Sequence, residues 1–65
     1  MTKESILKNL GQGLELEQKA EGTCKEIMSF FSDKQTLDAI RYIRDDETKH
    51  IGLVKELIRI ISKYQ

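Results

Sequence analysis

The feature that most constrains the fold is a 4-3 spacing of apolar residues in the second half of the chain. Residues three and four apart lie on one face of an α-helix, so this spacing predicts a helix over about residues 34–63. The apolar stripe is as wide as the one a bundle helix buries. Six residues form its seam and three more widen it: Ile40, Ile43, Val54, Leu57, Ile61 and Tyr64, with Leu37, Ile51 and Ile58 beside them.

The first half of the chain repeats the spacing less regularly. Three glycines interrupt it, and each weakens a helix by about 1 kcal/mol relative to alanine. We expect one helix over about residues 3–31, with a shorter helix beginning near Leu14 after a bent arm as the alternative. Glycine on the seam would also permit close helix approach. The seam consists of Ile6, Leu10, Gly13, Glu17, Ala20, Cys24, Ile27 and Phe31.

The two stripes are separated by a turn expected at about residues 32–34. Ser32 or Asp33 can cap the second helix, because a short side chain with an oxygen atom accepts a free N–H of the first turn. The sequence therefore predicts an all-α protein in which residues 1–65 form a single antiparallel helical hairpin.

A hairpin of 65 residues buries too little surface to be comfortably stable alone. Cys24 is the single cysteine, so no internal disulfide can form, and a metal or a partner remains. Two helices cannot enclose a core, so we expect a homodimer that forms a four-helix bundle, with higher even-numbered oligomers as an extension.

Composition narrows the function classes. Eleven basic and eleven acidic residues cancel, which gives no footprint for nucleic acid, and no apolar run approaches the length of a membrane span. We expect a cytoplasmic protein in which Cys24 is a small core residue, with a redox thiol as the alternative. No C-x-x-C is present, which argues against a zinc-ribbon or rubredoxin-type module.

Glu47 and His50 occupy the two positions of the second seam that are not apolar. Three apart on a helix, they share one face. In a hairpin that turns near residues 32–33, Glu17 lies at the same height between them. A two-fold axis would bring together four carboxylates and two imidazoles, the ligand set of di-metal carboxylate bundles. Such ligands suit iron, two ions per dimer, with manganese or zinc as alternatives.

Other polar residues near this level have competing interpretations. Glu21 would replace Glu17 as a ligand if the first helix were rotated; otherwise its height predicts an ion pair with Arg44. Asp46 precedes His50 by one turn, so it either holds the second ring nitrogen or is an exposed carboxylate. Packing or rim positions are expected for Tyr42 and Tyr64, and a core or an assembly surface for Ile58, Ile60 and Ile61.

Glu17-Gln-Lys-Ala20, followed thirty residues later by Glu47-Thr-Lys-His50-Ile-Gly52, resembles one half of the rubrerythrin and ferritin-like superfamily. The stretch from Asp45 to His50 is similar to the second-helix motif of that superfamily. The two-helix length looks most like the encapsulated ferritins. The resemblance covers nearly the whole chain, although its specific part is about six residues.

The resemblance implies a ferroxidase-type centre in which Glu17, Glu47 and His50 are the metal ligands and the catalytic residues, oxidising Fe(II) with dioxygen or peroxide. Cys24 stands where the rubrerythrin pattern often has tyrosine, so a tyrosine-assisted redox step is not expected. No recognisable targeting tail supports delivery to an encapsulin shell. The alternative function is a non-catalytic dimerising hairpin, either structural or adaptor, with or without a stabilising metal.

Overall fold

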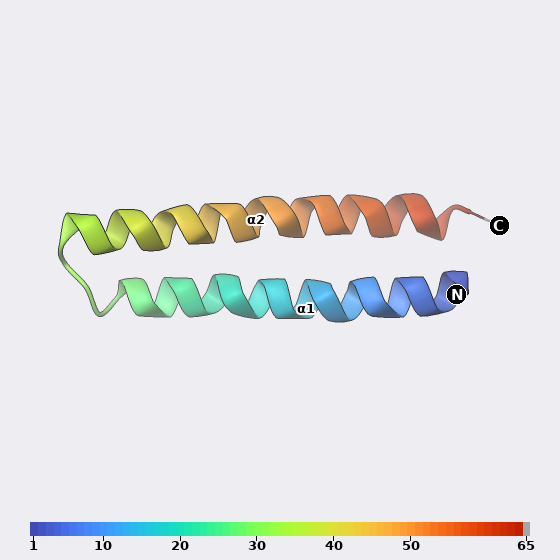
Figure 1. Cartoon of the computed structure of the whole chain (residues 1–65), viewed down its shortest axis with the longest axis horizontal. Helices are drawn as coiled ribbons and strands as arrows, with labels where there is room; N and C mark the ends of the chain where they lie inside the picture. The colour runs from blue at the N-terminus through green and yellow to red at the C-terminus, as the bar shows by residue number, and fades with distance from the viewer. Residues whose placement is uncertain (65) are drawn as a thin grey trace.

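The computed structural model describes residues 1–64, which form two helices and no strand. Helix α1 (Lys3–Met28) and helix α2 (Lys34–Ser62) run antiparallel side by side, with the turn at one end and both termini at the other (Figure 1). The hairpin is a thin rod with extents of 51 × 14 × 14 Å. The predicted all-α helical hairpin is confirmed.

Both helices begin at capping residues that the local sequence supplies. The Thr2 side chain accepts a hydrogen bond from the Ser5 backbone N–H, and the Ser5 hydroxyl accepts one from the Thr2 backbone N–H. At α2, Asp33 is the cap, and its carboxylate accepts from Thr36 N at 2.9 Å. Of the two expected capping residues, Asp33 rather than Ser32 therefore fills this position, and it satisfies a free N–H of the first turn.

Helix α1 ends at Met28, three residues before the expected end at about residue 31. The backbone N–H groups of Ser29, Phe30 and Phe31 bond to carbonyls three residues back, not four. The last turn thereby tightens and the α-helix stops. At the other end, α1 is helical from Lys3, through Gly11 and Gly13, so a shorter helix starting near Leu14 is wrong.

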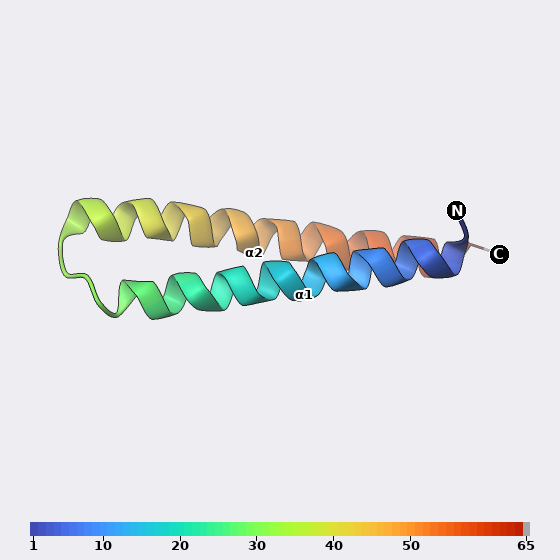
Figure 2. The same ribbon diagram turned by 60° about the horizontal axis from the view of Figure 1, so that its bottom comes forward.

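The two helices pack through one flank of each apolar stripe. Along α2, the residues that approach α1 are buried or half-buried: Leu37, Ile40, Arg44, Glu47, Ile51, Val54, Ile58 and Ile61. Among the described residues only Cys24 and Ile51 are classed as buried, so Cys24 is a small core residue as expected. Such a two-layer rod, seen from a second direction in Figure 2, cannot enclose a larger core.

The other side of the hairpin exposes large apolar residues. Ile43, Leu53, Leu57 and Ile60 lie on α2 and are all exposed, and so is Tyr64, which follows the end of the helix. Ile58 and Ile61 therefore belong to the packed flank, whereas Ile60 lies on the open one. Gly13 does not mediate close approach within the hairpin, because a Cβ there would meet nothing within 4 Å.

A side chain from the start of α1 closes the open end of the hairpin. Lys3 Nζ donates to Ser62 O at 3.0 Å and also to Tyr64 O. A cation at a helix C-terminus satisfies free carbonyls and opposes the negative end of the helix dipole. Neither helix within residues 1–64 is long and apolar enough to cross a lipid bilayer.

Candidate metal centre

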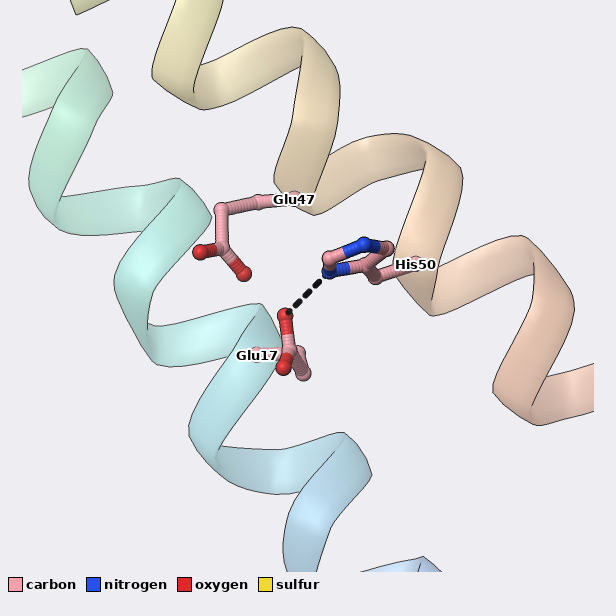
Figure 3. Close-up of side chains that lie close together, drawn as sticks. All are labelled: Glu17, Glu47 and His50. Carbon is pink, nitrogen blue, oxygen red and sulfur yellow. Dashed lines mark ion pairs between the residues drawn. The ribbon is translucent and has the colours of Figure 1, made fainter.

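Glu17, Glu47 and His50 meet halfway along the hairpin. Glu17 projects from α1 and the other two from successive turns of α2, and all three point toward one another (Figure 3). One ligand-type atom from each lies within 4.8 Å of the others. The three residues therefore lie at one level of the hairpin, as the sequence predicted, because they fall on facing seams of two antiparallel helices.

His50 presents its two ring nitrogens to different carboxylates. Nδ1 lies 3.9 Å from Glu17 Oε2, and Nε2 lies 3.9 Å from Asp46 Oδ2. Both distances are too long for a hydrogen bond and mark Coulombic neighbours. The Nδ1 edge therefore faces the cluster, while Asp46 stands at the nitrogen pointing away from it. Asp46 is therefore an exposed carboxylate that lies beside the second ring nitrogen without a hydrogen bond to it.

The two carboxylates of the cluster lack the partners that such groups usually find. Glu17 Oε2 and Glu47 Oε2 are buried and accept no hydrogen bond. Among residues 1–64, neither carboxylate forms an ion pair with lysine or arginine. Arg44 turns instead to Asp45, at 3.1 Å. A buried carboxylate oxygen without a partner destabilises the folded state, so a cation or a proton bound at these two atoms would stabilise it.

Proximity to Glu17 raises the pKa of Glu47 above its ordinary value of 4.5. The largest cause is the closeness of the two carboxyl groups, which can share a hydrogen bond only when one of them carries a proton. Desolvation and the negative charge of Glu17 act in the same direction, while His50 opposes them. Two carboxylates at one site cannot both ionise without cost. A divalent cation removes the same cost.

The Glu47→Gln variant is expected to have a higher melting temperature than the parent near pH 7, when both are free of metal. A carboxyl whose folded pKa is raised favours folding while it is protonated, below its ordinary pKa of 4.5, and this contribution is lost as the pH rises through the folded pKa. The amide never ionises, so the advantage of the variant disappears below about pH 4.5. Circular-dichroism melts of chelated samples at both pH values measure this. Glu15→Gln, at an exposed position of α1, is the control; an equal gain there, or a gain at both pH values, would contradict the prediction.

The predicted ion pair between Glu21 and Arg44 is wrong. Glu21 instead accepts a hydrogen bond from the Thr48 hydroxyl at 2.5 Å, across the two helices, and lies 3.8 Å from Lys25. Arg44 leans along its own helix toward Asp45 and contacts Met28 Sδ at 4.0 Å. Since Glu21 is occupied by Thr48, it is not a substitute for Glu17 in the cluster.

Sequence reasoning missed two polar contacts between the helices. Lys3 and Ser62 lie at equal height in the hairpin, so height was an available signal for that contact. Thr48 lies one turn further along α2 than the residue level with Glu21, so height did not indicate their hydrogen bond. Tyr42 and Tyr64 are both exposed. Comparison with protein-family models, curated proteins and solved structures finds no match to this chain.

Proposed function

We propose that this protein is a di-iron carboxylate protein with ferroxidase-type activity, assembled from two hairpins. Glu17, Glu47 and His50 of each chain would bind ferrous iron, the substrate, at the level where they meet. We also propose that the hairpin corresponds to one half of a rubrerythrin or ferritin-like bundle, as in the encapsulated ferritins. Manganese or zinc would bind the same oxygen and nitrogen donors.

The observation that carries the proposal is the pair of buried, unpartnered oxygens, Glu17 Oε2 and Glu47 Oε2, beside the Nδ1 edge of His50. If these carboxylates belonged to a structural ion pair, a lysine or arginine side chain would lie beside them. If they belonged to an ordinary surface cluster, both oxygens would be exposed to water. Two carboxylates and one imidazole without such partners are a typical ligand set for a divalent transition metal.

The proposal includes a second copy of the chain because one hairpin supplies only three ligand side chains. His50 is half exposed, and it lies among the apolar residues of the open face. A copy covering that face would bury those residues and bring a second set of ligands. Two divalent ions would then offset the charge of four carboxylates, which could not otherwise be buried together.

The chemistry needs an oxidant that accepts two electrons. Two ferrous ions each give up one electron: with dioxygen and two protons they form hydrogen peroxide, and with peroxide and two protons they form two waters. The chain's own contribution is to hold the iron in place. Carboxylate ligands favour the ferric product because a harder, more highly charged ion binds anionic oxygen more strongly.

Anaerobic loading with ferrous iron tests the proposal directly. We expect one iron per chain on a dimer or a larger even-numbered oligomer, measured by metal analysis together with native mass. Admission of air or peroxide should then convert the bound iron to the ferric state in proportion to the sites, followed by ultraviolet absorbance. A metal-free dimer that ignores iron would overturn the proposal and favour a non-catalytic dimerising hairpin.

A further inference from the structure

Three acidic side chains are half-buried, whereas every other acidic side chain of residues 1–64 is exposed. Two of the three, Glu17 and Glu47, belong to the metal cluster, and each has one oxygen without a partner. Glu21, the third, has neighbours at both oxygens. Its Oε2 accepts a hydrogen bond from the Thr48 hydroxyl of α2 at 2.5 Å, and its Oε1 lies 3.8 Å from Lys25 Nζ. The Glu21 carboxylate is therefore held beside the cluster without being part of it.

We infer that the hydrogen bond from Thr48 to Glu21 is a positioning contact, which sets the rotation of α2 about its own axis and thereby the aim of the proposed metal ligands. This inference rests on the proposed function, because it concerns how those ligands are directed at one ion. It adds Thr48 and Glu21, which are not ligands themselves, to the residues on which metal binding depends.

The contact and the cluster lie at the same level of the hairpin, on opposite sides of Glu47. Successive residues of an α-helix are turned by about 100° around the axis. Thr48 therefore lies about 100° from Glu47 in one direction, and His50 lies about 60° from it in the other. On α1, Glu21 follows Glu17 by one turn, so these two side chains project from the same face. A hydrogen bond on one side of the interface thus resists rotation that would displace the ligands on the other.

The apolar contacts between the helices leave this rotation loosely defined. The apolar stripe of α2 is wider than one contact, and hydrophobic attraction has no direction of its own. A hydrogen bond weakens steeply as its angle departs from linear, so one that joins the two helices specifies their rotation. In the described chain, the contact from Thr48 to Glu21 is the one hydrogen bond between side-chain oxygens of α1 and α2. The neighbouring contact of Arg44 with Met28 is to sulfur, a weak acceptor.

A small rotation would be enough to separate the ligands. The ends of side chains lie about 5–6 Å from the axis of an α-helix, so a rotation of about 20° moves them by about 2 Å. This displacement equals the length of a bond from a metal ion to nitrogen or oxygen, about 2.0–2.2 Å. Removal of a group that orients a metal ligand weakens metal binding by about 10–100-fold.

The Thr48 hydroxyl has two acceptors within reach. Its oxygen lies 3.0 Å from Arg44 O, one turn back on α2, and 2.5 Å from Glu21 Oε2. A hydroxyl carries one hydrogen, and a charged carboxylate accepts it more strongly than a carbonyl does, so Glu21 is the acceptor. Thr23 of α1 provides a matched control, because its hydroxyl donates to Lys19 O, at 3.0 Å, within its own helix.

Binding of Co²⁺ tests the inference, because the visible absorption of this ion reports the geometry of its ligands. Thr48→Val keeps the size of the side chain and removes the hydroxyl. At a temperature where circular dichroism shows every variant to be fully helical, Thr48→Val and Glu21→Ala should each weaken Co²⁺ binding by at least about 10-fold. Both should also change the absorption spectrum at saturation. Thr48→Ser and Glu21→Gln should restore the affinity and the spectrum, because serine still donates the hydrogen bond and the glutamine carbonyl still accepts it.

Two controls separate positioning from stability. Thr23→Val should bind Co²⁺ as the parent does. Ile58→Val removes one carbon from a half-buried side chain of the packed flank, which lowers stability without touching the contact. It should also leave the Co²⁺ affinity and spectrum unchanged. The double variant of Thr48→Val with Glu21→Ala should bind no more weakly than either single variant, since both remove the same hydrogen bond.

Parent-like affinity and spectrum in Thr48→Val would overturn the positioning role and leave the proposed metal site intact. Tighter binding in Thr48→Val, or a loss in Glu21→Gln as large as that in Glu17→Gln, would show that Glu21 is itself a ligand and would also overturn it. A parent chain that takes up no Co²⁺ would overturn the proposed function and this inference with it, since oxygen and nitrogen ligands bind Co²⁺ more tightly than Fe²⁺.

Discussion

Replacement of Glu47 by glutamine is expected to abolish iron oxidation and to weaken binding of ferrous iron by about 100-fold or more. Loss of groups that only support a metal ligand already costs about 10–100-fold in affinity, and Glu47 is placed as a ligand itself. Glutamine keeps the size of the side chain but removes the charge that would hold the cation. Anaerobic titration with ferrous iron measures the affinity, and the ferric absorbance after admission of air measures the oxidation.

The matched control is Glu56→Gln, on the same helix but exposed and paired with Arg59. It should bind and oxidise iron as the parent does. Glu17→Gln should behave like Glu47→Gln, and Glu15→Gln, two residues from Glu17 and exposed, like the parent. Circular dichroism establishes that every variant remains helical. Unchanged oxidation by Glu47→Gln would show that the metal site lies elsewhere or does not exist.

Divalent manganese is expected to raise the melting temperature of the parent protein by about 10–20 °C. A ligand present at 100 times its dissociation constant stabilises the folded state by about 2.7 kcal/mol, and each kcal/mol shifts the melting temperature of a domain this small by about 4–8 °C. Manganese has the ligand preferences of ferrous iron but is not readily oxidised in air, so binding is measured without the reaction.

Thermal melts with and without manganese measure this shift, and a chelator should reverse it. Glu47→Gln should gain only a small fraction of the shift, because its carboxamide neither repels Glu17 nor attracts the ion. The size of the shift should also depend on protein concentration, since the bound state is proposed to be a dimer. An equal shift in the parent and in Glu47→Gln would show that manganese acts at other carboxylates.

The meeting of the three cluster residues was predictable because it depends on only two properties of the chain. Helical spacing places Glu47 and His50 on one face, and the position of the turn sets which residue of α1 lies at their level. Asp33 and the tightened end of α1 change the turn by a few residues without altering that level much. The three side chains therefore come together as expected even though α1 ends earlier than expected.

The interaction of Glu21 was not predictable in the same way. Height placed it near Arg44, but height does not say which way a long side chain turns. Arg44 has an acidic neighbour in Asp45 on its own helix, and Thr48, one turn further along α2, offers Glu21 a hydroxyl. The choice between such partners depends on the rotation of each helix about its axis, which seam residues alone do not determine.

By itself, the sequence determined the two helices, the place of the turn and the common level of Glu17, Glu47 and His50, because periodicity and length are properties of the chain. Only the tertiary structure decided which flank of each helix is packed and which is open, and that the two facing oxygens, Glu17 Oε2 and Glu47 Oε2, are buried without a partner. The physical reason is that an apolar stripe wider than one contact can meet a neighbouring helix along either edge. The packing of every side chain between the helices selects one of the two edges.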